Sequence, residues 1–168
     1  VVLAAGGFPQ DPVRRKALFP HAPNGYEHAS PAPPGNTGDG LRLGEAIGAS
    51  VDDTLPNNAA WVPVSRPPRA DGTLGTFPHF VDRSKPGVIA VTRSGKRFTN
   101  EANSYHDFCQ AMAKTCKAEQ QEICAFFIAD HKTLRKYGLG YVNNPRQPAN
   151  QRFGVIRAAS RHFTSNRH

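Results

Sequence analysis

The sequence predicts an α+β fold, and three stretches of the chain lead to this prediction. Residues 88–100 have the pattern of a hairpin with a tight turn at "RSGK". Residues 104–116 show the apolar spacing of a helix, and residues 123–130, "ICAFFIAD", are typical of a buried strand. The 168 residues suffice for one full domain with a hydrophobic core. We therefore expect helices and strands mixed around such a core.

The first expected element is a buried parallel strand over residues 1–8, "VVLAAGGF". The run is apolar on both faces and ends at a Gly pair that lets the backbone turn sharply. Asp11 and Pro12 then favour the N-cap and first position of a short surface helix. Residues 20–36 form a long loop rich in Pro and Gly, and loops of this length usually serve a site or are mobile.

A second helix is expected after this loop. Thr37 or Asp39 is placed to cap it, its apolar positions lie mostly on one face, and Gly48 is expected to end it. A strand around residues 61–65 follows, and then a stretch rich in turns, "RPPRADGTLG".

The hairpin is the clearest local pattern in the chain. Residues 88–92 are expected to form one strand and "RFTN", residues 97–100, the returning strand. Ser104 then caps a helix whose stripe contains Phe108, Met112 and Cys116. A further short helix is expected over "DHKTLRKYGLG", stopped by Gly138.

The distribution of charge argues against a nucleic-acid-binding protein. All 13 acidic residues lie at or before Asp130, so the net charge of +8 comes from the part of the chain after it. A basic terminal stretch can bind phosphates, but this one shows no known nucleic-acid motif. We interpret residues 146–168 as a basic tail of uncertain order.

Cysteine and histidine usage indicates reduced thiols and no metal site. Cys109, Cys116 and Cys124 are odd in number and contain no CxxC pair, in a sequence without a recognisable signal peptide. The 7 His residues show no zinc-binding spacing with a supporting carboxylate. No apolar run is long enough to span a membrane. We expect a cytoplasmic protein.

Three motifs resemble one flavoprotein family. "VVLAAGGF", "NTGDGLRLGEAIGA" and "GVIAVTRSGKRFTNEANSYHDF" occur in this order. Together they resemble the fumarate reductase and succinate dehydrogenase flavoproteins and the 3-ketosteroid dehydrogenases, which are FAD-dependent oxidoreductases. The resemblance covers roughly residues 1–145 and implies transfer of hydride between flavin and an activated C–C bond of a ketone or related substrate.

The resemblance also implies a domain organisation. Residues 1–45 resemble a remnant of the FAD-binding domain with one of its strands, and residues 46–145 resemble the capping, or catalytic, domain that holds the substrate. The sequence contains no GxGxxG turn for the FAD pyrophosphate. We therefore expect an inactive fragment that lacks bound FAD, whereas the full-length protein binds FAD and a small-molecule substrate.

Eight residues are implied to contact the cofactor by the resemblance: Ala4, Ala5, Gly6, Gly7, Thr37, Gly38, Asp39 and Gly40. Small residues at the first four positions let the cofactor approach the backbone, and the acid of "TGDG" reaches an FAD hydroxyl or the pyrophosphate region. The structural alternatives, a tight turn and a plain helix cap, stay open.

Three residues are candidates for catalysis. In fumarate reductases an Arg acid precedes the hairpin strand, and Arg83 and Lys85 lie near that place; a solvated hairpin flank is the alternative. Ketosteroid dehydrogenases use Tyr residues as electrophile and base, and Tyr105 is the candidate here; a half-buried Tyr near a helix cap is the alternative. Ala59 or Ala60 stands where fumarate reductases have a substrate-binding His, which counts against fumarate.

A function of another class stays open. The chain is alternatively a stand-alone interaction domain whose basic tail contacts an acidic partner or nucleic acid. An exposed strand edge at residues 1–4 is expected to favour pairing with a second copy of the chain.

Overall fold

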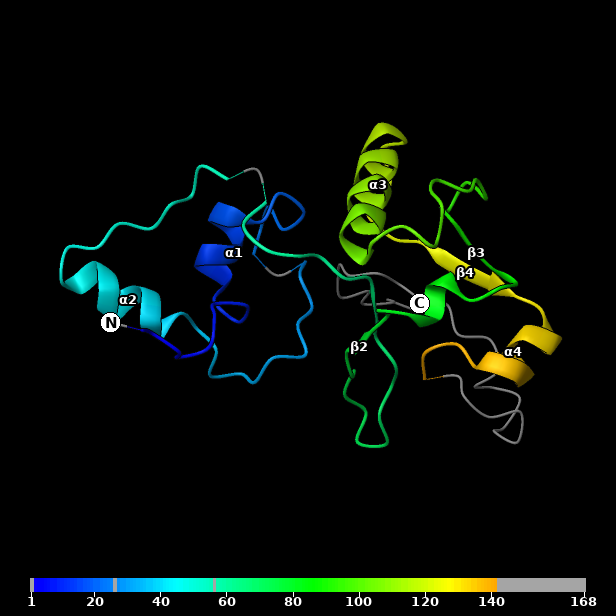
Figure 1. The fold of residues 1–168 in the computed structure, drawn as a ribbon, viewed down its shortest axis with the longest axis horizontal. Coiled ribbons are helices and arrows are strands. Elements are labelled where there is room, and N and C mark those ends of the chain that lie inside the picture. Colours follow the sequence, from blue (N-terminus) through cyan, green and yellow to red (C-terminus); the bar gives the residue numbers. More distant parts are fainter. Residues whose placement is uncertain (1, 26, 56, 142–168) are drawn as a thin grey trace, which may run out of the picture. The chain divides into compact units, whose positions relative to one another are not determined.

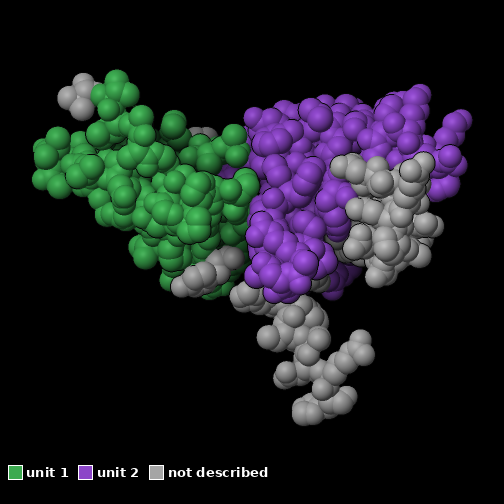
Figure 2. Space-filling model, turned by 90° about the horizontal axis from the view of Figure 1, so that it is seen from below, with its two compact units in different colours: residues 1–60, 160–168 green, residues 61–159 purple. Residues whose placement is uncertain are grey.

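The computed structural model describes residues 2–25, 27–55 and 57–141, and it contains both helices and strands (Figure 1). The chain divides into two compact units, one of residues 1–60 and one that begins at Trp61 (Figure 2). This division lies later in the chain than the domain boundary predicted after residue 45. The predicted basic tail, residues 146–168, lies outside the described residues.

In the first unit, helix α1 spans Pro12–Leu18 as predicted. The carboxylate of Asp11 accepts hydrogen bonds from the backbone amides of Val13 and Arg14, which are free amides of the first turn. Phe19 ends the helix, is 4% exposed, and its ring centroid lies 5.5 Å from that of Phe8. This contact between the two rings packs the end of α1 against the segment that precedes the helix.

The predicted strand at the start of the chain is not observed. The described residues 2–7 carry no strand assignment and are exposed. A parallel strand requires a neighbouring strand to accept and donate its ladder hydrogen bonds. The strands that the structure describes all lie in the second unit. The described residues of the first unit therefore contain no strand with which the apolar run could pair. Pairing with a second copy stays a prediction.

Helix α2 spans Asp39–Ala46, but its cap differs from the prediction. The N-cap residue is Gly38, with a φ of 87°, instead of Thr37 or Asp39, and no side chain caps the helix. Gly48 terminates it as expected: its φ is 87°, and its amide donates to the Glu45 carbonyl at 3.0 Å.

In the second unit, strand β1 (Val64–Ser65) pairs antiparallel with β2 (Phe77–Pro78). The predicted strand around residues 61–65 therefore forms only at its end. A short 3₁₀ turn, η1, follows at Asp82–Ser84.

Strand β3 (Val88–Val91) forms as predicted, but its partner is β4 (Phe126–Ala129) in an antiparallel pair, with Val88 opposite Ala129. The predicted returning strand at residues 97–100 is reduced to one bridge between Val91 and Arg97. A side chain replaces the missing ladder there, because the Ala90 amide donates to the Glu101 carboxylate at 2.8 Å.

Helix α3 spans Tyr105–Ala118, and the predicted Ser104 caps it by accepting a hydrogen bond from the Asp107 amide at 3.1 Å. Its predicted stripe is buried: Phe108 and Cys116 are 0% exposed and Met112 is 4% exposed. Burying a side chain such as Phe108 stabilises the fold by about 1.5–3 kcal/mol.

Helix α4 spans His131–Tyr137 and ends at Gly138 as predicted. The Asp130 carboxylate caps its start by accepting a hydrogen bond from the Thr133 amide. Leu139, which follows it, packs with Val88 in a small cluster of the core. Among the described residues, no helix is long and apolar enough to cross a bilayer.

Candidate functional site

Two segments predicted to contact a cofactor lie side by side in the first unit. The Gly38 amide donates a hydrogen bond to the Gly7 carbonyl at 3.1 Å. A Cβ added at Gly40 would stand 3.5 Å from the Cβ of Ala5 and 3.7 Å from that of Leu3. The structure thus brings the "AAGG" and "TGDG" segments together, although a long loop separates them in the sequence.

Glycine is required at two positions where these segments meet. Gly6 has a φ of +76°, and a Cβ there would lie 3.0 Å from the Oδ1 atom of Asn36. At Gly38, φ is +87° and a Cβ would lie 3.1 Å from the Cβ of Phe8. Both glycines therefore combine a left-handed backbone with a close contact, which an L side chain would strain.

The start of helix α2 has the chemistry of an anion-binding site. No side chain caps it, so the backbone amides of its first turn, which includes Gly40, are available to a ligand. Thr37 and Asp39 are joined by Arg42, whose guanidinium donates to the Thr37 carbonyl at 2.8 Å and to the Asp39 carboxylate. These exposed groups and the glycines fit a phosphate and the hydroxyls beside it, as FAD provides.

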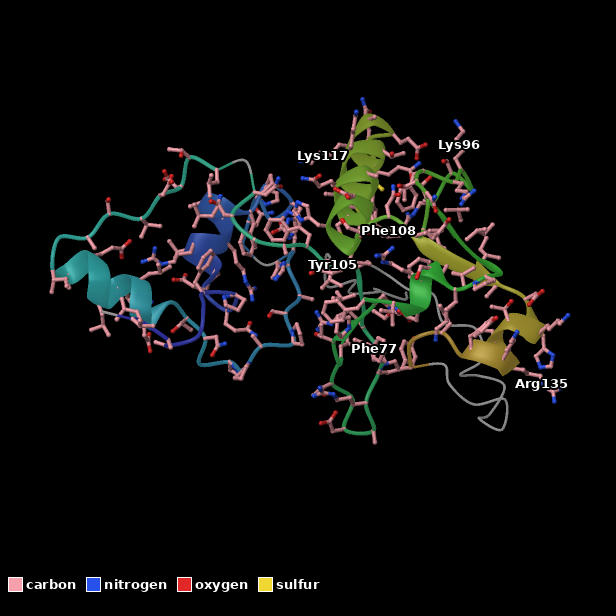
Figure 3. The ribbon with its side chains drawn as sticks, viewed as in Figure 1. Phe77, Lys96, Tyr105, Phe108, Lys117 and Arg135 are labelled. Atoms are coloured by element: carbon pink, nitrogen blue, oxygen red, sulfur yellow. The ribbon has the colours of Figure 1, made fainter. Side chains whose placement is uncertain are left out.

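In the second unit, Tyr105 forms an exposed aromatic pair with Phe80. Their ring centroids lie 5.4 Å apart, and the rings are nearly perpendicular at 85°. Tyr105 is 37% exposed, Phe80 49% and its neighbour Val81 71%. Tyr105 is the first residue of α3, and Phe77 belongs to strand β2; both side chains are labelled in Figure 3. We call Tyr105, Phe80 and Val81 the Tyr105 face: it presents exposed apolar side chains and one phenol hydroxyl, which can donate or accept a hydrogen bond.

Arg83 is placed in the interior of the second unit. It is 3% exposed, its guanidinium donates to the Glu101 carbonyl, and its charged group lies 5.4 Å from the Phe108 ring centroid. The Nε atom has no hydrogen-bond partner in the structure. Burial lowers the pKa of Arg83, against the opposing effects of Cys109 and Asp82.

The side chain of Lys85 reaches the end of helix α4. Its Nζ atom donates to the Tyr137 carbonyl at 3.0 Å, which satisfies a carbonyl of the last helical turn. Arg83 and Lys85 thus hold structural contacts, and their catalytic role stays a prediction.

A buried polar chain in the second unit was not predicted from the sequence. Ser65, His79 and Asp82 form consecutive hydrogen bonds through the two nitrogens of the imidazole. The sequence offers one weak signal for it, the spacing of three between His79 and Asp82. The pairing of β1 with β2, which brings Ser65 to His79, was not predicted either.

Cys109, Cys116 and Cys124 are buried, and the structure contains no disulfide between them. That the thiols are reduced stays a prediction. Within the described part of the chain, no group of three or more His, Cys, Asp or Glu residues is arranged to hold a metal ion.

Comparison with known proteins identifies a family match over nearly the whole chain. The family described as FAD binding domain matches residues 1–166. Among curated proteins, 4-oxocyclohex-2-ene-1-carboxylate 5-dehydrogenase from Sinomonas cyclohexanicum is 43% identical over 141 residues, which cover 84% of this chain and 24% of that protein.

Two further comparisons concern steroid dehydrogenases. The 3-oxosteroid 1-dehydrogenase of Mycobacterium tuberculosis is 37% identical over 114 residues, covering 67% of this chain and 18% of that protein. The crystal structure of 3-ketosteroid delta1-dehydrogenase from Sterolibacterium denitrificans with 1,4-androstadiene-3,17-dione matches with a TM-score of 0.70 and 34% identity. That match covers 84% of this chain and 24% of that one. The chain therefore spans about a quarter of the length of these relatives or less.

Proposed function

Because the chain belongs to the FAD binding domain family of flavin-dependent dehydrogenases, we propose that it acts, within a longer protein, in the dehydrogenation of a cyclic ketone. The bond oxidised is a CH–CH bond close to the ketone. This proposal joins the family membership to the Tyr105 face of the second unit.

The substrate class follows from what the relatives have in common. One acts on an oxocyclohexene carboxylate and another on a 3-oxosteroid, as their names state. Both compounds carry a ketone on a six-membered carbon ring. We propose such a ring ketone as the substrate, with the apolar Phe80 and Val81 side chains contacting the carbon ring.

The first unit is proposed to hold part of the FAD. The amides at the start of α2 would bind phosphate, and the Asp39 carboxylate would accept a hydrogen bond from a hydroxyl of the cofactor. Ala4, Ala5, Gly6 and Gly7 would allow close approach to the backbone, as would Thr37, Gly38 and Gly40. When bound, FAD supplies the acceptor for the hydride that leaves the substrate.

Tyr105 is proposed to handle the proton of this reaction. Loss of a hydride from one carbon leaves a proton to be removed from the neighbouring carbon, and a hydrogen bond to the ketone oxygen eases that removal. The Tyr105 phenol can donate that hydrogen bond, or, once it has lost its own proton to become a phenolate, take up the proton. It is at the surface and next to apolar side chains, which suits contact with a ring ketone.

We further propose that residues 46–145 form the capping domain that carries the substrate, and residues 1–45 the part of the FAD-binding domain. The exposed Tyr105 face lies in the second unit and the glycine-rich segments in the first, which supports these separate roles, whereas the compact units divide after residue 60 and not after residue 45. On this assignment we expect the isolated chain to be inactive, because it spans about a quarter of the length of its relatives or less.

The observation that carries the proposal is the Tyr105–Phe80 pair on the surface of a chain from this family. The test is turnover of the full-length protein with 4-oxocyclohex-2-ene-1-carboxylate and a 3-oxosteroid, using an artificial electron acceptor. The Tyr105→Phe variant should retain FAD and lose kcat by roughly 100- to 10,000-fold. A flavin-containing protein that oxidises neither ketone would contradict the proposal.

The interaction-domain alternative depends on the basic tail, which lies outside the described residues. It stays a prediction, and salt-dependent retention on heparin that is abolished by deleting residues 146–168 would support it.

A further inference from the structure

A buried chain of hydrogen bonds joins Ser65, His79 and Asp82 in the second unit. The Nδ1 atom of His79 lies 2.6 Å from the Oδ2 atom of Asp82, and its Nε2 atom bonds to the Ser65 hydroxyl. Ser65 and His79 are 0% exposed, and Asp82 is 9% exposed. All three side chains are therefore shielded from water, which makes each of these hydrogen bonds costly to lose.

The order of donors in this chain follows from the charge of Asp82. Burial raises the pKa of Asp82, but hydrogen bonds from His79 and from the Gly140 amide act in the other direction, and the pKa is lowered overall. An ionised carboxylate only accepts, so Nδ1 of His79 donates to it. In the neutral imidazole, Nε2 then accepts from the Ser65 hydroxyl.

This constellation is not a hydrolytic triad, although it contains the same three residue types. A nucleophilic Ser must reach a substrate, and the Ser65 side chain has no exposed surface. The imidazole is also enclosed: the rings of Phe77 and Phe127 lie 5.2 and 5.4 Å away, and a Cβ at Gly140 would stand 2.5 Å from its Cε1 atom. The enclosed His79 imidazole can therefore affect the protein surface only by fixing the backbone segment to which it belongs.

The backbone that it holds is the segment of residues 79–83. His79 and Asp82 point inward, whereas Phe80 and Val81 between them are exposed. The next residue, Arg83, is again buried and donates to the Glu101 carbonyl. The segment is thus fixed on both sides of Phe80.

We propose that the Ser65–His79–Asp82 chain is a positioning device that holds the Phe80 ring against Tyr105. His79 and Asp82 are positioning residues, because they reach the Tyr105 face only through the segment of residues 79–83. Their importance for catalysis rests on the proposed function, since that function assigns the Tyr105 face to the substrate. Within this segment, Phe80 places its ring 5.4 Å from the Tyr105 ring and so joins the buried chain to the Tyr105 face.

The experiment is NMR of the chain with labelled Phe and Tyr rings, comparing four variants with wild type. His79→Met removes both hydrogen bonds of the imidazole, and Ser65→Ala removes only the one to Nε2. His79→Asn keeps a donor at the position of Nδ1 toward Asp82. Thr92→Val is the matched control, because Thr92 is 1% exposed and hydrogen-bonded to Ser94 and Glu119, away from this segment.

The expected result is a change confined to the Tyr105 face. In His79→Met, cross-peaks between the Phe80 and Tyr105 rings should fall at least roughly twofold, since edge-to-face contact depends on ring position. Ser65→Ala should reduce them less, His79→Asn should restore them, and Thr92→Val should leave them unchanged while lowering the thermal midpoint.

Wild-type cross-peaks in folded His79→Met would overturn the proposal. If that variant does not fold, wild-type cross-peaks in Ser65→Ala would overturn it, as would an equal loss in Thr92→Val. The measurement requires neither FAD nor a ketone. Its failure is therefore distinct from failure of the proposed function, which would show as absent ketone oxidation with intact ring contacts.

Discussion

The Glu101 carboxylate accepts a hydrogen bond from the backbone amide of Ala90 in strand β3, with 2.8 Å between the two atoms. Ala90 is 0% exposed and Glu101 4% exposed, so neither group can turn to water instead. The same carboxylate pairs with Arg97, whose side chain is 56% exposed. The inner hydrogen bond should therefore matter more to stability than the outer ion pair.

Substitution of these partners separates the two contributions. Glu101→Met leaves the buried Ala90 amide without an acceptor and should lower the free energy of unfolding by about 1–3 kcal/mol. Arg97→Met removes only the exposed partner and should cost less than about 1 kcal/mol. Urea unfolding of both variants provides the measurement, and an Arg97→Met cost equal to that of Glu101→Met would contradict the account.

The same carboxylate predicts an acid-sensitive stability. Burial raises the pKa of Glu101, but hydrogen bonds from Arg97 and the Ala90 amide oppose this, and the pKa lies below its ordinary value of 4.5. Its contribution to stability is thus complete well above pH 4.5 and is lost as pH falls through the lowered pKa. Thermal midpoints from pH 7 downward should show a smaller acid loss in Glu101→Met than in wild type; parallel curves would refute this assignment.

Two glycines of the first unit allow a test of the close contact between the two segments that we propose to bind FAD. Gly38→Ala adds a Cβ 3.1 Å from Phe8, whereas Gly48→Ala meets nothing within 4 Å, and both positions have a φ of +87°. Each variant should lose about 1–2 kcal/mol from the backbone strain. Gly38→Ala should be the less stable of the two in thermal unfolding, and it alone should lower FAD retention by the full-length protein. Equal effects would show that the contact with Phe8 is unimportant.

The three buried thiols should be inert in the folded chain. Burial raises the pKa of Cys109 to about 12, although Arg83 acts to lower it, and burial also raises the pKa of Cys116. Only the thiolate reacts, so a thiol-specific dye at pH 8 should label the folded chain at least ~100-fold more slowly than the unfolded chain. Rapid labelling of one thiol before unfolding would contradict the observed burial.

Phe80 offers a test of the Tyr105 face that leaves the phenol in place. In the full-length protein, Phe80→Ala should raise KM for a ring ketone by roughly 3- to 10-fold, because an aromatic contact is worth about 0.5–1.5 kcal/mol. Leu74→Ala is a suitable control, since Leu74 is 50% exposed at the other end of the β1 and β2 pair. A similar rise in KM in the control would argue against a specific role for Phe80.

Local signals in the sequence predicted the helices well. Asp11 and Ser104 were predicted as caps because a side-chain oxygen at a helix start acts on amides only a few residues away. The buried stripe of α3 was likewise predictable from its spacing.

Long-range pairing could not be predicted in the same way. The strand β3 pairs with β4, and the segment expected beside it is held by the side chain of Glu101. The start of the chain is as apolar as a buried strand, but the described residues of its unit contain no other strand with which it could pair. The Ser65–His79 contact depends on the pairing of β1 with β2, which no local pattern indicates.

The roles of the candidate site residues stay predictions. The segments proposed to hold the cofactor came from the family resemblance, and in the structure they are in contact through Gly7 and Gly38. Among the catalytic candidates, only Tyr105 is exposed on an apolar surface, whereas Arg83 is buried and Lys85 binds a helix end. Burial of an Arg depends on tertiary packing around it, which a sequence pattern does not encode.

The most direct test of the central claim is a single-turnover experiment with the full-length flavoprotein. Under anaerobic conditions, mixing it with 4-oxocyclohex-2-ene-1-carboxylate or a 3-oxosteroid should bleach the flavin absorbance. The bleaching rate should fall roughly 100- to 10,000-fold in Tyr105→Phe, with FAD still bound. Bleaching at the wild-type rate in that variant, or none by either ketone in the wild-type protein, would contradict the claim.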